Sequence, residues 1–210
     1  MLRVGLTGGL ASGKSLVGEA LVELGCQLIK ADELGHQTLE PGGEAYEAAV
    51  AAFGRGILDD GGRIDRRLLA AEVFGSPERL ALLNRFVHPA VIRKEQEWMA
   101  EVEARDPQAI AVVEAAILIE TGSYRRFDRL IVTACGEEQQ IERAMKRDGI
   151  TREEAITRMR RQMPLAEKRK YADFVIDTSG SKEETYEQAR RVYAALRAAS
   201  GRRSAKARGY

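Results

Sequence analysis

Residues 8–15 read GGLASGKS, and this stretch decides the fold of the chain. The pattern G-x-x-x-x-G-K-[ST], in which a glycine-rich loop surrounds a phosphate, is matched by Gly8, Gly13, Lys14 and Ser15. Glycines let the backbone approach the phosphate closely, and the N–H groups that begin the next helix donate to its oxygens. LRVGLT before the loop predicts a strand and KSLVGEALVEL after it predicts a helix, as the pattern requires. The alternative is a glycine-rich turn before an ordinary helix.

The rest of the chain alternates short apolar runs with longer helical patterns, which predicts an α/β fold with helices on both faces of a parallel sheet. The five predicted strands are residues 2–7, 27–30, 109–116, 129–135 and 173–177. The predicted helices are residues 14–24, 31–39, 44–53, 66–74, 76–102, 137–149, 151–162 and 182–199. Pro89 should kink or restart the fifth of these helices, because proline cannot donate a helical hydrogen bond.

The helical stretch 31–105 lies between the second and third predicted strands, which predicts a lobe inserted into the α/β core. We expect one domain over residues 1–200. Its core would comprise residues 1–30, 106–140 and 171–200, and residues 141–170 would form a helical lid. The basic end GRRSAKARGY, residues 201–210, is expected to be a disordered tail.

Composition excludes several classes of protein. The 210 residues carry a formal net charge of +1, which argues against a protein that coats nucleic acid or binds a membrane surface through charge. Cys26 and Cys135 lie far apart in no metal-binding spacing, which favours two buried thiols in a reducing cytosol. The longest apolar run, residues 109–119, is too short to span a membrane. We expect a cytoplasmic monomer with no nucleic-acid or membrane partner.

The loop predicts how a nucleoside triphosphate is held. Lys14 would bridge the β- and γ-phosphates, and the Ser15 hydroxyl would ligate Mg²⁺. The chain lacks the N-K-x-D motif that reads guanine in GTPases, which favours a small ATP-dependent kinase. The predicted ATP-binding residues are Gly8, Ala11, Ser12, Gly13, Lys14, Ser15 and Leu16.

Asp32 is the candidate on the side of the phosphoryl acceptor. It follows the second predicted strand, and the carboxyl ends of parallel strands line the ligand crevice. A carboxylate there could accept a proton from an attacking hydroxyl or help to place Mg²⁺. The alternative is that Asp32 caps the helix ADELGHQ.

Three further side chains are candidates. For His88 three roles are open: a structural role, a contact with the substrate, or catalysis. Glu114, inside an apolar strand, would contact a Mg²⁺-bound water or form a salt bridge. Arg143 would close over the phosphates, because its planar fork binds phosphate oxygens in pairs; the alternative is a solvated basic face. The same alternatives apply to the basic residues that follow it, Arg147, Arg158, Arg160, Arg161, Lys168, Arg169 and Lys170.

In their order, these motifs resemble the dephospho-CoA kinase family. The segments that carry the resemblance are GLTGGLASGKS, KADELGHQ, EPGGEAY, DDGGRIDRRLLAAEVF, RFVHPAV, VVEAAILIE, QIERAMKRDG, RMRRQMP and ADFVIDTSG, spread over about residues 1–200. The family's enzymes use ATP to phosphorylate the ribose 3′-hydroxyl of dephospho-CoA, the last step of coenzyme A synthesis. The alternatives are another small-molecule or nucleotide kinase, or a module that senses ATP without transferring phosphate.

The resemblance implies roles for particular positions. Residues 11–16 would form the ATP loop, Asp32 would be the general base, and Arg143 would be the arginine of the lid. The inserted helices would bind dephospho-CoA, and the loop after Asp177 would lie against adenine. The implied catalytic residues are Asp32, Lys14 and Arg143, and the predicted substrate-binding residues are Thr7, Asp32, His88 and Glu114.

The chain departs from the family pattern at four places. Lys30 stands where a first aspartate is common, so any role of that carboxylate is lost or moved. Ala11 replaces a frequent glycine, which is harmless if its φ is negative. The sequence Glu114-Ala115-Ala116 stands where many members have Asp-x-Pro, which keeps the negative charge on a longer side chain. Thr178 replaces a common asparagine, which weakens the expectation of an adenine contact there.

Overall fold

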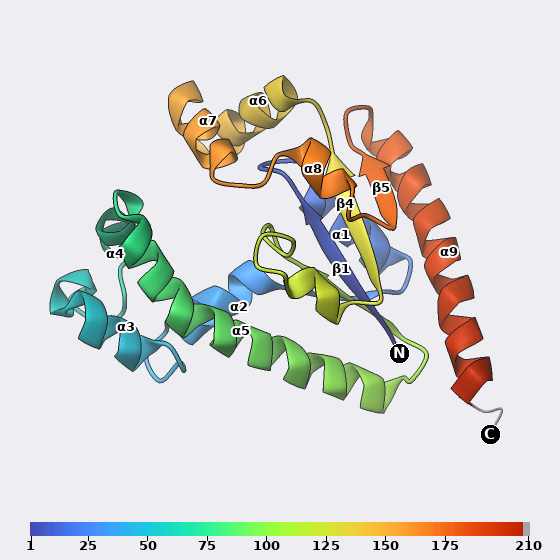
Figure 1. The fold of residues 1–210 in the computed structure, drawn as a ribbon, viewed down its shortest axis with the longest axis horizontal. Helices are drawn as coiled ribbons and strands as arrows, with labels where there is room; N and C mark the ends of the chain where they lie inside the picture. Colours follow the sequence, from blue (N-terminus) through green and yellow to red (C-terminus); the bar gives the residue numbers. More distant parts are fainter. Residues whose placement is uncertain (208–210) are drawn as a thin grey trace. The chain divides into compact units, whose positions relative to one another are not determined.

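The computed structural model describes residues 1–207, apart from the side chains of residues 74 and 202–207. It contains a five-stranded sheet in the order β2-β3-β1-β4-β5, of which β1, β4 and β5 are labelled in Figure 1. The strands are β1 Leu2–Gly8, β2 Gln27–Lys30, β3 Ile110–Glu114, β4 Arg129–Ala134 and β5 Phe174–Asp177. β1 pairs in parallel with β3 and β4, and β4 pairs in parallel with β5. The predicted α/β class and its five strands are confirmed.

The helices follow the predicted pattern to within a few residues at most ends. They are α1 Lys14–Glu23, α2 Ala31–Thr38, α3 Tyr46–Phe53, α4 Arg66–Phe74, α5 Pro77–Arg105, α6 Glu137–Asp148, α7 Arg152–Arg160, α8 Leu165–Arg169 and α9 Lys182–Ala207. Two short 3₁₀ helices, η1 Arg55–Ile57 and η2 Ser123–Arg126, and the five-residue α8 were not predicted. At the start of α7 the capping box of Thr151 and Glu154 is present.

Two predictions about helix ends are wrong. The predicted restart at Pro89 does not occur, because α5 continues through this exposed proline for 29 residues. α9 runs past the predicted end at residue 199 to Ala207, so the predicted tail is helical up to there. Residues 208–210 lie outside the described residues.

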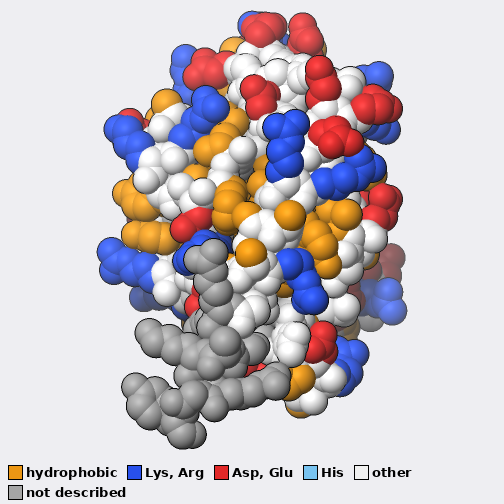
Figure 2. Space-filling model, turned by 90° about the vertical axis from the view of Figure 1, so that its right-hand side faces the viewer, with side chains coloured by type: hydrophobic (Ala, Val, Ile, Leu, Met, Phe, Trp, Pro, Cys, Tyr) orange, Lys and Arg blue, Asp and Glu red, His pale blue; other side chains and the backbone are white. Residues whose placement is uncertain are grey.

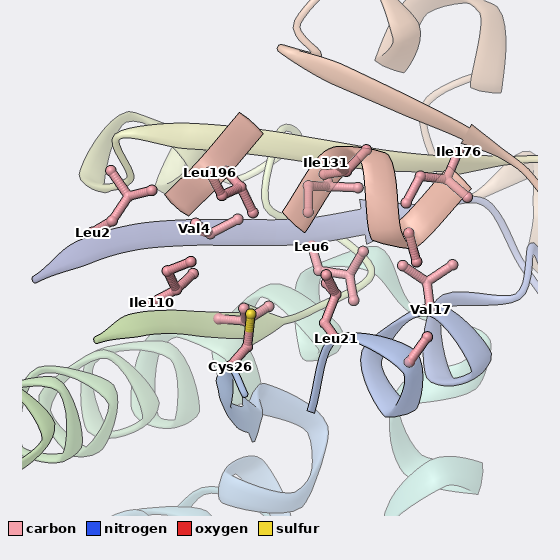
Figure 3. Packing of buried hydrophobic residues seen from close by; sticks show 14 residues of the cluster. Leu2, Val4, Leu6, Val17, Leu21, Cys26, Ile110, Ile131, Ile176 and Leu196 are labelled. Carbon is pink, nitrogen blue, oxygen red and sulfur yellow. The ribbon is translucent and has the colours of Figure 1, made fainter. Parts of the chain in front are cut away.

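One face of the sheet packs against α1 and α9 (Figure 3). Successive side chains of a strand point to opposite faces, so Leu2, Val4 and Leu6 of β1 share this side. They contact buried residues of the neighbouring strands, among them Ile110, Ile131 and Ile176, and of the helices, among them Val17, Leu21 and Leu196. This packing fixes the carboxyl end of β1 and the start of α1, the two ends of the glycine-rich loop.

The chain divides into two compact units. One comprises residues 1–29 and 99–210 and contains the sheet; the other, residues 30–98, is helical. The predicted lobe of residues 31–105 nearly coincides with the helical unit, except that residues 99–105 of α5 belong to the sheet unit. Inside the helical unit, Leu34, Ala49 and Ile57 are buried, and Arg93 pairs with Glu44.

On the face drawn in Figure 2, Lys and Arg side chains alternate with Asp and Glu, and hydrophobic side chains are scattered between them. None of the helices in the described part of the chain is long and apolar enough to cross a membrane. Cys26 and Cys135 are buried free thiols, as predicted, and burial raises the pKa of Cys26 to about 12.

Candidate phosphate-binding and phosphoryl-transfer site

The glycine-rich loop joins β1 to α1, with Gly13 as the N-cap of the helix at a φ of 82°. Helical N–H groups at such an end have no intrahelical acceptor and are suited to bind an anion. Ala11 has a φ of 48°, the one positive φ at a non-glycine position among the residues that the structure describes. The replacement of glycine by Ala11 was expected to be harmless only at a negative φ, and this φ is positive. A left-handed conformation costs a residue with a Cβ atom about 1–2 kcal/mol.

Side chains crowd the outer side of the loop. A Cβ atom at Gly8 would clash with the hydroxyls of Thr133 and Ser12, and one at Gly9 would clash with the Gln140 amide. Gly8 therefore requires glycine, because a Cβ atom there would also meet the Thr133 backbone oxygen, whereas at Gly9 the flexible end of Gln140 could move aside. Thr133 and Gln140 were missed in the sequence, although a threonine inside the apolar strand 129–135 is a polar signal.

Side-chain donors hold two carbonyl groups of the loop. The Gly9 oxygen accepts hydrogen bonds from the Ser12 hydroxyl at 2.9 Å and from Lys14 Nζ at 3.0 Å. The Ser12 oxygen accepts from the Thr178 hydroxyl at 2.9 Å. In a planar trans peptide, C=O and the next N–H point in opposite directions, so a donor that holds the oxygen also fixes the direction of the next N–H. The contact between Ser12 and Thr178 thus orients the N–H of Gly13.

Ser15 and Glu114 bring two kinds of oxygen ligand together at the start of α1. The exposed Ser15 hydroxyl donates to Glu114 Oε1 at 3.2 Å. Mg²⁺ prefers oxygen ligands and keeps several waters, so a hydroxyl with a nearby carboxylate fits its chemistry. No cluster of three or more His, Cys, Asp or Glu side chains suited to a metal occurs among residues 1–207 as described.

Arg143 lies on α6 and reaches the loop through Thr178. Its Nη2 donates to the Thr178 carbonyl at 2.7 Å, and its Nη1 lies 3.4 Å from the Thr178 hydroxyl. Two of the other predicted lid arginines form ion pairs with one carboxylate: Arg147 lies 2.7 Å and Arg158 3.2 Å from Asp148. Arg147 is the larger cause of the lowered pKa of Asp148. Of these three arginines, only Arg143 is linked to the loop by the hydrogen bonds described.

The tip of the loop packs against α6 and α7. Leu10 and Ala11 contact a small apolar cluster that is centred on Ile141, Ala144 and Ala155. The side chain of Ala11 therefore takes part in a packing contact that a glycine would lack. This contact accounts for an alanine at a strained position.

Thr7 and Lys168 are internal supports. Thr7 is fully buried, and its hydroxyl donates to the Ala116 carbonyl at 3.2 Å. Its side chain therefore supports the segment after β3 instead of facing solvent. Lys168, predicted within a basic lid run, is also fully buried and pairs with Glu120 at 2.9 Å. Burial is the larger influence on the pKa of Lys168 and lowers it.

Asp32 and His88 belong to the helical unit. Asp32 is exposed in the first turn of α2, whose N-cap is Lys30, so the interpretation of Asp32 as the helix cap is wrong. Lys30 forms an ion pair with Glu33 at 3.3 Å. His88 is half-buried on α5, and burial lowers its pKa, which favours a neutral imidazole near pH 7. The structure leaves Asp32 accessible to a ligand.

Comparisons with known proteins agree with one another. A family model described as dephospho-CoA kinase matches residues 2–184. A dephospho-CoA kinase of Aquifex aeolicus is 44% identical over 196 residues, covering 93% of this chain and 98% of its own. A crystal structure of a Thermus thermophilus protein has a TM-score of 0.79 at 35% identity, covering 92% of this chain and 96% of that one. A dephospho-CoA kinase of Campylobacter jejuni has a TM-score of 0.63 at 27% identity, with the same coverage.

Proposed function

The chain belongs to the dephospho-CoA kinase family, and we propose that it transfers the γ-phosphoryl group of ATP to the ribose 3′-hydroxyl of dephospho-CoA. The products would be coenzyme A and ADP. The observation that carries this proposal is the glycine-rich loop at the start of α1, with Lys14 and the pair of Ser15 and Glu114, in a chain that matches the family over residues 2–184. Residence in the cytoplasm and a monomeric state remain predictions.

The donor half of the reaction would rest on the loop. Backbone N–H groups at the start of α1 would bind the phosphates of ATP. Lys14, which donates to the Gly9 carbonyl at 3.0 Å, would turn to the β- and γ-phosphates when ATP binds. Ser15, with Glu114 behind it, would hold Mg²⁺. The bound ion would supply charge neutralisation to the phosphates.

The acceptor half would rest on Asp32. Phosphoryl transfer passes through a loose transition state, so positioning and charge neutralisation matter more than strong base catalysis. Asp32 would accept a hydrogen bond from the ribose 3′-hydroxyl, orient its oxygen in line with the γ-phosphorus, and take the proton as the new P–O bond forms. A half-buried neutral His88 could add a substrate contact in the same unit.

Arg143 would complete the transfer site. Its guanidinium already binds the loop after β5 through Thr178. A modest side-chain rotation would let the same fork bind the oxygens of the transferring group, where its fixed charge stabilises the charge that develops. This role links the predicted lid to the phosphate loop.

The direct test is a coupled assay of ADP release with a panel of acceptors. Dephospho-CoA, nucleoside monophosphates and shikimate are assayed side by side with ATP and Mg²⁺. We expect release that depends on dephospho-CoA and exceeds that with the other acceptors by orders of magnitude. A preference for another acceptor would indicate a different small-molecule kinase, and ATP binding without acceptor-dependent release would indicate a sensing module.

A further inference from the structure

Lys168 makes a set of contacts that none of the predicted roles explains. It lies on α8, and its side chain is fully buried. Its ammonium contacts three oxygens: the Gly8 carbonyl at 3.2 Å, the Ala116 carbonyl at 2.6 Å and Glu120 Oε1 at 2.9 Å. An ammonium has three N–H donors, so these acceptors satisfy it completely. Such full satisfaction is needed for a charge that has been removed from water.

The acceptors of Lys168 join segments that are distant in the sequence. Gly8 is the first glycine of the phosphate loop and the last residue of β1. Ala116 follows the end of β3, the neighbouring strand, and its oxygen also accepts the Thr7 hydroxyl. The ammonium therefore ties the carboxyl ends of two adjacent strands together at the base of the loop.

Glu120 extends these contacts to the segment between α7 and α8. Its Oε1 also accepts the backbone N–H of Met163 at 2.9 Å. Lys168 and Met163 both lie in the predicted lid, residues 141–170, whereas Gly8 lies in the phosphate loop. Glu120 therefore links Met163, between α7 and α8, to Lys168 on α8, whose ammonium contacts the phosphate loop.

We propose that Lys168 is a positioning residue for the phosphates of ATP, because its ammonium anchors the Gly8 and Ala116 carbonyls and so fixes where the glycine-rich loop leaves β1. Gly8 pairs with Thr133 in the parallel ladder of β1 and β4, which directs the Gly9 N–H to that strand, so this support acts on the start of the loop as a whole. The Thr178 hydroxyl supports the loop at a second place, through the Ser12 carbonyl. The inference rests on the proposed function only in requiring that the loop binds ATP.

The test measures ATP binding directly, by calorimetry with Mg²⁺ and without acceptor. The variant Lys168→Met keeps the length of the side chain and removes its charge and donors. The matched control is Lys170→Met, two residues away, whose exposed side chain pairs with Glu167 at 2.8 Å. Because a hydrogen bond to a charged group is involved, we expect Kd for ATP to rise about 10- to 100-fold in Lys168→Met and less than about 2-fold in Lys170→Met. KM for ATP should rise more than kcat falls.

A second variant keeps the proposal testable if Lys168→Met does not fold. Glu120→Gln retains the shape of the side chain and an acceptor for Met163 but weakens the hold on the ammonium. We expect a several-fold weaker ATP affinity. An unchanged or tighter affinity in Glu120→Gln would contradict positioning, because a lysine that acted only through its charge would bind ATP more tightly once its carboxylate partner was neutral.

Loss of thermal stability in folded Lys168→Met, with Kd for ATP unchanged, would also overturn the proposal and leave Lys168 a purely structural residue. These outcomes differ from failure of the proposed function. If the unaltered chain binds ATP but does not phosphorylate dephospho-CoA, the proposed reaction is wrong, and the calorimetric comparison still decides the role of Lys168.

Discussion

Arg143 binds the Thr178 carbonyl through Nη2 at 2.7 Å, and the Thr178 hydroxyl in turn binds the Ser12 carbonyl at 2.9 Å. Thr178 is 2% exposed and Ser12 is fully buried, so the hydrogen bond between them is shielded from water, whereas the Arg143 contact is partly buried. This chain of contacts links the predicted lid arginine to the backbone of the phosphate loop through one side chain.

Thr178→Val keeps the shape of the side chain but removes its hydroxyl. The Ser12 carbonyl then loses a buried donor, whereas the Ala134 carbonyl still accepts the backbone N–H of residue 178, and we expect the free energy of unfolding to fall by about 1–3 kcal/mol. KM for ATP should rise several-fold because the Gly13 N–H is less well oriented. The control is Thr185→Val, another buried threonine, whose hydroxyl binds the Ser181 carbonyl at 3.0 Å. Equal values of KM for ATP in the two variants would contradict the orienting role.

Ala11→Gly tests the strain at a φ of 48°. Relief of about 1–2 kcal/mol is opposed by about 0.5–1 kcal/mol for the added chain entropy of glycine and by loss of the methyl contact with α6 and α7. We therefore expect little net change in unfolding free energy. Ala194→Gly, at an exposed position inside α9, has no such relief and should lose about 0.5–1 kcal/mol. Chemical denaturation of both variants gives the comparison, and a larger loss at Ala11 would refute the strain.

Asp65 gives the helical unit a pH dependence. Its carboxylate is the N-cap of α4, and hydrogen bonds from the backbone of Leu68 and then of Arg67 lower its pKa below 3.8. A lowered folded-state pKa contributes stability above the unfolded pKa and loses it as pH falls through the folded value. Asp65→Asn should therefore reduce the acid sensitivity of α4 below about pH 4, measured by amide hydrogen exchange, and keep its protection at neutral pH. Asp65→Ala should lower protection at both pH values; a neutral-pH loss in Asp65→Asn would count against this account.

Asp32→Asn tests the acceptor side. The amide keeps the size of the side chain but cannot take the proton, so we expect kcat to fall about 100- to 10,000-fold. Kd for ATP should stay within about 2-fold, because ATP binding would rest on the loop. Glu33→Gln is the neighbouring control in the same turn of α2 and should keep its turnover. Near-normal turnover in Asp32→Asn would remove Asp32 from the mechanism.

The sequence carried most of the fold because its signals are local. Glycines, caps and apolar runs placed the strands and most helices, and the phosphate loop was evident from its own residues. The restart expected at Pro89 does not occur, because whether a helix continues through a proline depends on the packing of the whole helix and not on the local sequence alone. α8 was missed because five residues are too few to show a helical period.

The supports of the loop were hard to foresee for a different reason. Lys168 stands in a run of basic residues, where a solvated or phosphate-facing side chain is the natural interpretation. Only the tertiary fold brings Gly8, Ala116 and Glu120 around its ammonium. Thr178 was discussed only as a candidate for a contact with adenine, yet its hydroxyl donates to the Ser12 carbonyl. Such contacts between distant segments have no periodic signal in the chain.

The most direct measurement is identification of the product formed from ATP and dephospho-CoA. Purified protein is incubated with both and Mg²⁺, and the product is analysed by mass spectrometry and ³¹P NMR, with Lys14→Ala as the inactive control. We predict one new phosphate, on the ribose 3′-oxygen, formed in step with ADP and absent with Lys14→Ala. ADP formation without phosphorylated dephospho-CoA, or a phosphate on any other oxygen, would contradict the assigned reaction.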